Sequence, residues 1–238
     1  MHKIERAVIL AAGKGERLRP VTLDTPKPLV RVNGVRMIDT ILNALLHHGI
    51  TEIYVVTGYC KEQFCELAHD FPQIVLLDNP WYESCNNISS LYAAREHLEN
   101  AFIIDGDQMI HSEAVLSPYF ERSGYNAVWM ERSENEWMMT VQDGIVTGCQ
   151  KNGGTDAWQL YSISRWSAED ARKLRRHLEL EFVQNNNRQI YWDDIPMFCH
   201  ADAYTLGITQ MNAQDVLEID TLAELIHADS SYRHYHEG

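Results

Sequence analysis

The segment from Ala7 to Val30 places the strongest constraint on how this chain can fold. It reads AVILAAGKGERLRPVTLDTPKPLV and joins a continuous apolar run to two glycines, several cations and three prolines. An unbroken apolar run of this length is typical of a strand buried on both faces of a parallel sheet. We therefore expect a central strand over residues 7–12, followed by a loop suited to binding an anion.

Strand and helix patterns alternate through the first half of the chain. Apolar residues between Met37 and Leu46 recur on one helical face, and Gly49 can end that helix before a strand at Ile53–Thr57. The alternation continues with expected helices near residues 61–69 and 89–98 and expected strands at 74–77 and 101–104. This order favours a doubly wound α/β sheet with crossover helices.

The pattern after residue 125 is more antiparallel. Strands are expected at 125–130, 138–142 and 158–163, with Asp143-Gly144 as a hairpin turn. Ser167 should begin a helix that reaches about Phe182, and Thr221 should cap a last helix. Because no repeat or linker is visible, we expect a single domain over 1–238, in which the strand pattern changes between the first half (1–124) and the second (125–238).

Bulk properties exclude several classes of partner. The formal net charge is −14, so the long-range field repels nucleic acid and anionic membranes. Neither a signal-peptide layout nor an apolar run long enough to span a bilayer is present. The five cysteines contain no C-x-x-C pair, so they indicate reduced thiols in a cytoplasmic protein.

Two familiar anion-binding loops do not match residues 11–15. A Walker A loop would need a different sequence after Gly13-Lys14-Gly15, where this chain has Glu16-Arg17. A dinucleotide fingerprint needs a third glycine where this chain has Leu18. What remains is a bent turn whose backbone N–H groups can face a polyphosphate, with nearby cations at Lys14, Arg17, Arg19 and Lys27.

The string LAAGKGERLRPVTLDTPKPLV resembles the signature of nucleotidyltransferases that join a nucleoside triphosphate to a phosphorylated small molecule. The resemblance implies an α/β Rossmann-like fold, with a mixed, mostly parallel sheet flanked by helices and a small antiparallel portion. It also implies a nucleotide-binding half (1–124) and an acceptor-binding half (125–238). Arg17 and Lys27 are then catalytic residues on the triphosphate. The nucleotide-binding positions that it implies are Ala11, Ala12, Gly13, Lys14, Gly15, Asn87, Ser89, Ser90 and Asp105.

A second set of residues resembles one branch of that family, the bacterial CTP:phosphocholine cytidylyltransferases. Asn86 to Ser90 match a segment that precedes the metal-binding aspartate of that branch, and further matches lie at 134–137, 190–194 and 218–220. A quaternary ammonium donates no hydrogen bonds, so its site combines aromatic faces with carboxylates. The acceptor-binding residues expected on this basis are Glu136, Trp137, Tyr191, Trp192, Asp193 and Asp194.

A divalent cation is the expected cofactor. Asp105 and Asp107 follow a buried strand at the sheet edge where open α/β folds bind ligands, which is the same edge as the glycine loop. Hard cations such as Mg²⁺ take carboxylate oxygens together with the phosphates of a nucleotide. By resemblance, Asp107 and Asp220 hold Mg²⁺, while Asp105 supports the end of the strand.

The expected reaction is in-line attack by phosphocholine on the α-phosphorus of CTP, giving CDP-choline and pyrophosphate. The nearest alternatives are 2-aminoethylphosphonate or phosphoethanolamine as acceptor, whose primary ammonium would hydrogen-bond to the same carboxylates. A sugar 1-phosphate is a weaker alternative. A nucleotide sensor without catalysis is a rival of another class, and the combined presence of Arg17, Lys27, Asp107 and Asp220 argues against it.

Overall fold

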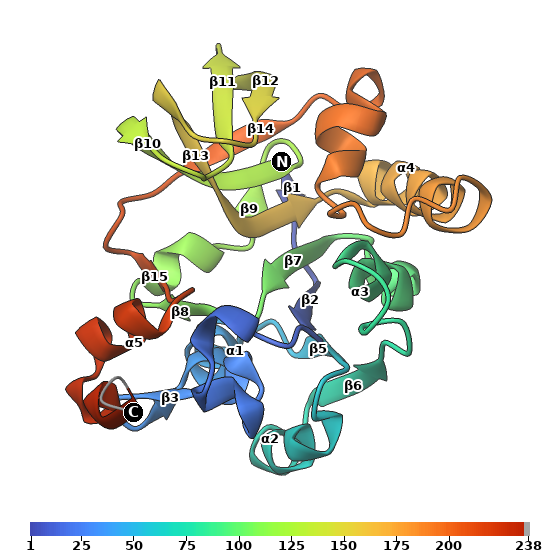
Figure 1. Ribbon diagram of the computed structural model, residues 1–238. Coiled ribbons are helices and arrows are strands. Elements are labelled where there is room, and N and C mark those ends of the chain that lie inside the picture. The colour runs from blue at the N-terminus through green and yellow to red at the C-terminus, as the bar shows by residue number, and fades with distance from the viewer. Residues whose placement is uncertain (236–238) are drawn as a thin grey trace.

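The computed structural model describes residues 1–235 (Figure 1). Its main sheet has nine strands in the order β10-β14-β12-β11-β13-β7-β2-β5-β6. Smaller two-stranded pairings join β1 (His2–Lys3) to β9 (Tyr119–Phe120), β3 (Arg31–Val32) to β4 (Val35–Arg36), and β8 (Gln108–Ile110) to β15 (Val216–Glu218). No helix within residues 1–235 combines the length and apolar character needed to cross a bilayer.

Four parallel strands form the first half of the sheet. They are β2 (Arg6–Ala11), β5 (Glu52–Thr57), β6 (Ile74–Asp78) and β7 (Ala101–Asp105), and β2 lies between β5 and β7. The apolar run over 7–11 is almost wholly buried, as expected of a strand covered on both faces. The predicted central strand is therefore confirmed, and its carboxyl end leads directly into the glycine loop.

Helices cover both faces of these parallel strands (Figure 1). They are α1 (Met37–His47), α2 (Phe64–Asp70) and α3 (Ile88–Ala93). Each of the two expected helices near 61–69 and 89–98 includes a turn of 3-10 helix, at Lys61–Gln63 and Arg95–His97. The apolar sides of α1 and α3 pack into two separate buried clusters, which places the sheet between two hydrophobic layers.

The second half extends the same sheet with mainly antiparallel strands, of which β10 and β13 are the longest. They are β10 (Gly124–Ser133), β11 (Met138–Gln142), β12 (Ile145–Gln150), β13 (Gly154–Trp166) and β14 (Gly207–Gln210). β13 pairs antiparallel with β7 and so joins the two halves into one sheet. Asp143 and Gly144 both have positive φ, which is the conformation required by the predicted hairpin turn.

Helix starts follow the predicted caps. Ser167 accepts a hydrogen bond from the Asp170 N–H at the start of α4 (Ala168–Glu179), which continues into a wider π-helical turn at Leu180–Gln184. Thr221 and Glu224 form a complete capping box at the start of α5 (Leu222–Ala228). A second π-helical turn, Ile195–Cys199, follows the acidic segment 193–194.

Candidate active site

Two adjoining cavities lie at the carboxyl ends of the parallel strands. The first has a volume of about 480 Å³ and is lined by residues of the glycine loop together with Asn86, Asn87 and Ser90. The second has a volume of about 420 Å³ and is lined by residues from 135–137, 160–162, 191–193 and 218–220. The residues that line both cavities are Arg17, Asn87, Asp105, Asp107, Tyr191 and Asp220. We call the first the nucleotide cavity and the second the acceptor cavity.

Lys27 links the two carboxylates that the sequence assigns to metal binding. Its Nζ atom lies 2.8 Å from Asp107 Oδ2 and 2.7 Å from Asp220 Oδ1. Burial alone lowers the pKa of the Lys27 ammonium, but the two carboxylates outweigh it and raise the pKa above its ordinary value. Arg17 lies 2.8 Å from the same Asp220 oxygen. The two predicted catalytic cations therefore converge on the carboxylate pair.

The local sequence explains why Lys27 is aimed so well. It begins a turn of 3-10 helix, Lys27–Leu29, between Pro26 and Pro28, so the backbone on both sides is restricted. Gly15 has φ +59, and a Cβ atom there would lie 2.9 Å from the Lys27 Cβ. A side chain at Gly15 would therefore meet the stem of Lys27. Thr22 fixes this bend by donating a hydrogen bond to the Gly15 carbonyl over 2.7 Å.

The carboxylate pair fits a divalent cation. Asp107 Oδ1 is buried and has no hydrogen-bond partner within residues 1–235. One oxygen of the carboxylate pair is therefore free to act as a metal ligand. Those residues contain no cluster of three or more His, Cys, Asp or Glu side chains arranged for a metal. Two protein carboxylates with phosphate oxygens from a bound nucleotide match the ligand preferences of Mg²⁺.

The acceptor cavity is strongly acidic. The acidic residues that line it are Asp105, Asp107, Glu136, Asp193, Glu218 and Asp220. Burial, with a contribution from Asp194, raises the pKa of Asp193 to about 7, and burial also raises the pKa of Glu136. Asp193 Oδ1 is buried without a hydrogen-bond partner in the part of the chain that the structure describes. The cavity therefore presents unsatisfied hydrogen-bond acceptors to a cationic ligand.

Two other acidic residues that line the acceptor cavity also have raised pKa values. The pKa of Glu218 rises to about 8 because burial and the Asp107 carboxylate oppose its ionisation. The pKa of Asp105 is raised well above its usual value for the same two reasons. Glu218 belongs to the family-like segment 218–220 but is not among the site residues expected from the sequence. Its position two residues before Asp220, on β15, is the sequence signal that could have identified it.

Most predicted nucleotide-binding residues line the nucleotide cavity, but two do not. Ala11, Ala12, Gly13, Gly15, Asn87, Ser90 and Asp105 line it. Lys14 is absent from both linings. Ser89 is buried, accepts a hydrogen bond from Asn79 and donates one to the Asn86 carbonyl. In this structure Ser89 therefore does not line the nucleotide cavity, and its hydroxyl instead holds the 86–90 segment.

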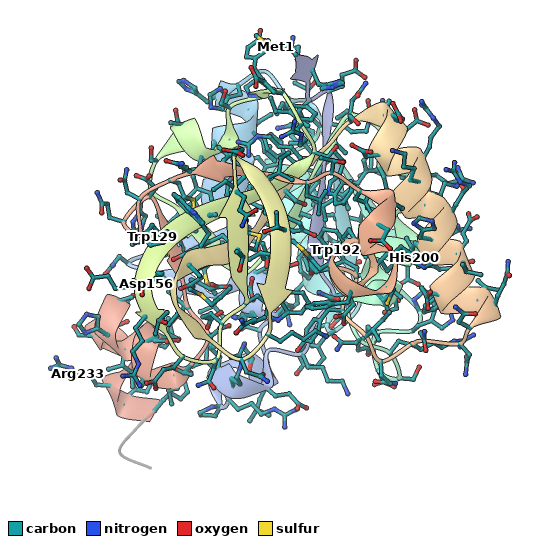
Figure 2. All side chains as sticks on the ribbon, turned by 90° about the horizontal axis from the view of Figure 1, so that it is seen from above. Met1, Trp129, Asp156, Trp192, His200 and Arg233 are labelled. Carbon is teal, nitrogen blue, oxygen red and sulfur yellow. The ribbon has the colours of Figure 1, made fainter. Side chains whose placement is uncertain are left out.

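Trp192 and Asp194 also differ from expectation. Trp192 is only 1% exposed and packs between Tyr125 and Trp166, each with its ring centre 6.0 Å away. It lies inside the molecule, away from its outline (Figure 2). Trp192 is buried because residues 191–194 form a tight turn, in which the Asp194 N–H donates a hydrogen bond to the Tyr191 carbonyl. This turn directs successive side chains to different sides. In this structure Trp192 does not line the acceptor cavity. Asp194 lies outside the lining as well, and its carboxylate is bound by Lys151 and the Tyr191 N–H.

The remaining predicted acceptor residues do line the acceptor cavity. Glu136, Trp137, Tyr191 and Asp193 come together there with Asn135, Leu160 and Ser162. The Trp137 and Tyr191 rings meet edge to face with their centres 5.9 Å apart. The cavity therefore offers two aromatic side chains, whereas the sequence also suggested Trp192. It also contains one carboxylate, that of Glu218, that was not expected.

Comparison with known proteins identifies the family of this chain. Residues 7–186 match the model of the MobA-like NTP transferase domain. A 2-aminoethylphosphonate cytidylyltransferase of Lancefieldella rimae is 39% identical over 229 residues, covering 95% of this chain and 92% of the relative. A choline-phosphate cytidylyltransferase of Streptococcus pneumoniae is 33% identical, covering 92% of this chain and 94% of the relative.

A solved structure gives the same assignment. The CTP:phosphocholine cytidylyltransferase from Streptococcus pneumoniae superposes with a TM-score of 0.87 at 30% identity, covering 99% of this chain and 98% of that chain. The expected fold is thereby confirmed over nearly the whole chain. The protein is a nucleotidyltransferase that belongs to the MobA-like NTP transferase family, within its cytidylyltransferases.

Proposed function

We propose that this protein transfers the cytidylyl group of CTP to 2-aminoethylphosphonate. A phosphonate oxygen attacks the α-phosphorus and forms the new P–O bond, while the bond from the α-phosphorus to the bridging oxygen breaks. The products are the CMP ester of the phosphonate and pyrophosphate. The attacking oxygen is already anionic, so the reaction needs no strong general base.

The chain's own residues supply positioning and charge. Arg17 lines both cavities and Lys27 lines the nucleotide cavity, and both would neutralise the charge that develops on the leaving pyrophosphate. Asp107 and Asp220 would hold Mg²⁺, which supplies charge neutralisation on the triphosphate. The glycine loop and the 86–90 segment would hold the nucleotide in line with the acceptor.

The single observation that favours a primary ammonium is Asp193, which lines the acceptor cavity and whose buried Oδ1 has no hydrogen-bond partner within residues 1–235. A buried acceptor of this kind gains most from a donor, and a primary ammonium carries three N–H donors, whereas a trimethylammonium group carries none. Glu136 beside it adds a second carboxylate. The 39% identical relative named for 2-aminoethylphosphonate points in the same direction.

Phosphocholine is the second candidate. The faces of Trp137 and Tyr191 support it, because aromatic rings attract a quaternary ammonium. The likeness to the pneumococcal enzyme supports it as well. The loss of Trp192 to the core removes one of the three rings on which this alternative depends.

Pyrophosphate release measured with CTP and a panel of acceptors tests the proposal. We expect kcat/KM for 2-aminoethylphosphonate to exceed that for phosphocholine by about tenfold or more, because the buried carboxylate rejects a ligand that cannot donate to it. Phosphoethanolamine, which has the same ammonium, should rank between them, and glucose 1-phosphate should give no turnover. A preference for phosphocholine would transfer the proposal to the second candidate, and turnover with the sugar alone would reject both.

A further inference from the structure

An ammonium group of the protein itself lies beside the acceptor cavity. Lys151 Nζ is 5.0 Å from the centre of the Trp137 ring and 4.8 Å from that of Phe198. The same ammonium forms an ion pair with the carboxylate of Asp194. Aromatic faces with a nearby carboxylate are the components with which proteins bind organic cations. We call Trp137, Phe198 and Asp194 the aromatic box.

The box is built from fixed parts. The Trp137 and Phe198 rings pack edge to face with their centres 5.5 Å apart. The Asp194 side chain is only 5% exposed, and its second oxygen accepts a hydrogen bond from the Tyr191 N–H over 3.0 Å. The box therefore keeps its shape through ring packing and backbone contacts.

The loop that carries Lys151 is also held in place. The Gly153 N–H donates to the Glu136 carbonyl over 2.9 Å, which ties the loop to the segment that contains Trp137. Gly153 has φ +76, and a Cβ atom there would lie 2.4 Å from the Ser133 carbonyl oxygen. Only glycine fits such a close approach of two backbones. Lys151 is thus presented to the box by a loop of fixed geometry.

The box shares one wall with the acceptor cavity. Trp137 and its edge-to-face partner Tyr191 line the cavity. Lys151, Phe198 and Asp194 do not belong to the lining. A cation bound in the box therefore lies beside the cavity, on Trp137, while a cation bound by Asp193 and Glu136 lies within it.

We propose that Lys151 is a positioning residue that determines acceptor specificity by filling the aromatic box with the protein's own cation. This inference rests on the proposed function and names the feature behind its selectivity. A quaternary ammonium forms no N–H hydrogen bonds with the carboxylates of the cavity and depends more on aromatic faces, so a filled box disfavours it. A primary ammonium is bound by Asp193 and Glu136 and does not need the box.

Substitution of Lys151 tests the inference through a ratio of two activities. In K151A and K151M, kcat/KM for 2-aminoethylphosphonate divided by that for phosphocholine should fall about tenfold, because the box opens and Asp194 loses its partner. K151R keeps a cation over the rings and should stay within about threefold of wild type. A merely structural role would lower both activities in parallel and leave the ratio unchanged, which would overturn the inference.

Lys61 provides the matched control. It is an exposed lysine whose Nζ lies 2.9 Å from Asp78, and it lines neither cavity. K61A and K61M also remove an ion-paired lysine and should leave the ratio unchanged. Thermal unfolding of each variant shows that the comparison is made on folded protein.

A binding measurement tests the box without turnover. A calorimetric titration measures the binding of tetramethylammonium chloride to each protein. Tetramethylammonium should bind K151A about three- to thirtyfold more tightly than wild type, because the substitution makes a cation–π site available. The double variant K151A/F198A should lose this gain. Equal binding by wild type and K151A would overturn the inference. If wild type turned over neither 2-aminoethylphosphonate nor phosphocholine, the proposed function would be rejected. The titration would still test the role of Lys151.

Discussion

Lys27 and Asp220 are 193 positions apart in the sequence, and their side chains meet over 2.7 Å. Asp107 lies on the other side of the same ammonium at 2.8 Å. The contact joins the glycine loop after β2, the turn after β7 and the segment after β15. It therefore holds together the three parts of the chain that the proposed reaction requires.

Loss of the Lys27 ammonium should remove most of the activity. In K27M, kcat for pyrophosphate release should fall on the order of 100-fold or more, because the charge on the leaving pyrophosphate loses a fixed cation. Methionine retains the length of the stem that packs against Gly15, so the fold should be preserved. Steady-state kinetics beside K61M as control checks this, and near-normal kcat in K27M would remove Lys27 from the mechanism.

Asp193 should make acceptor binding depend on pH. Its pKa is raised to about 7, so in the free protein it is largely protonated below that pH and ionised above it. A cationic acceptor favours the ionised form, so KM for 2-aminoethylphosphonate should fall as pH rises from 6 to 8, by about fivefold or more, since one ionisation can change binding up to tenfold per pH unit.

The matched variant for this prediction is D193N, which cannot ionise. The phosphonate titrates equally in both proteins, so only the difference between the two pH profiles reports on Asp193. The same shift has a stability consequence: because the folded protein keeps a proton that the unfolded chain releases above about pH 3.9, the contribution of Asp193 to folding is largest below that pH and is lost as pH rises through 7. Identical KM profiles in the two proteins would contradict the role given to Asp193.

Trp192 should matter for stability and little for substrate recognition. W192A should lower the free energy of unfolding by about 3–5 kcal/mol, because it leaves a cavity between Tyr125 and Trp166. W192F should lose much less and keep the acceptor KM close to wild type. Chemical denaturation and kinetics on both variants check this. A raised acceptor KM in a fully stable W192F would return Trp192 to the acceptor site.

The nucleotide half of the site could be predicted from the sequence because its parts follow parallel strands. Gly13 to Gly15 follow β2, and Asp105 and Asp107 lie at the end of β7, so the pairing of adjacent parallel strands brings them to one edge. Pro26 and Pro28, which restrict the backbone on both sides of Lys27, are also visible in the sequence. Asp220 comes from outside this pattern and was assigned through family resemblance alone.

The acceptor half was harder to predict because it is built from loops and turns. A four-residue turn decides that Tyr191 and Asp193 line the cavity while Trp192 enters the core, and spacing alone does not reveal this. Lys151 and Phe198 were not singled out because their contact with Trp137 joins segments that are distant in the sequence. The sequence could show that aromatic and acidic residues were present, whereas their partners depend on tertiary packing.

The central claim is that Asp107 and Asp220 bind a nucleotide through a divalent cation in the nucleotide cavity, which Lys27 also lines. The most direct measurement is the shift in unfolding temperature caused by CTP, with and without Mg²⁺, in wild type and in D107N/D220N. We predict that Mg²⁺ increases the CTP-dependent shift in wild type and has little effect in the double variant. An equal Mg²⁺-dependent shift in both proteins would contradict the account.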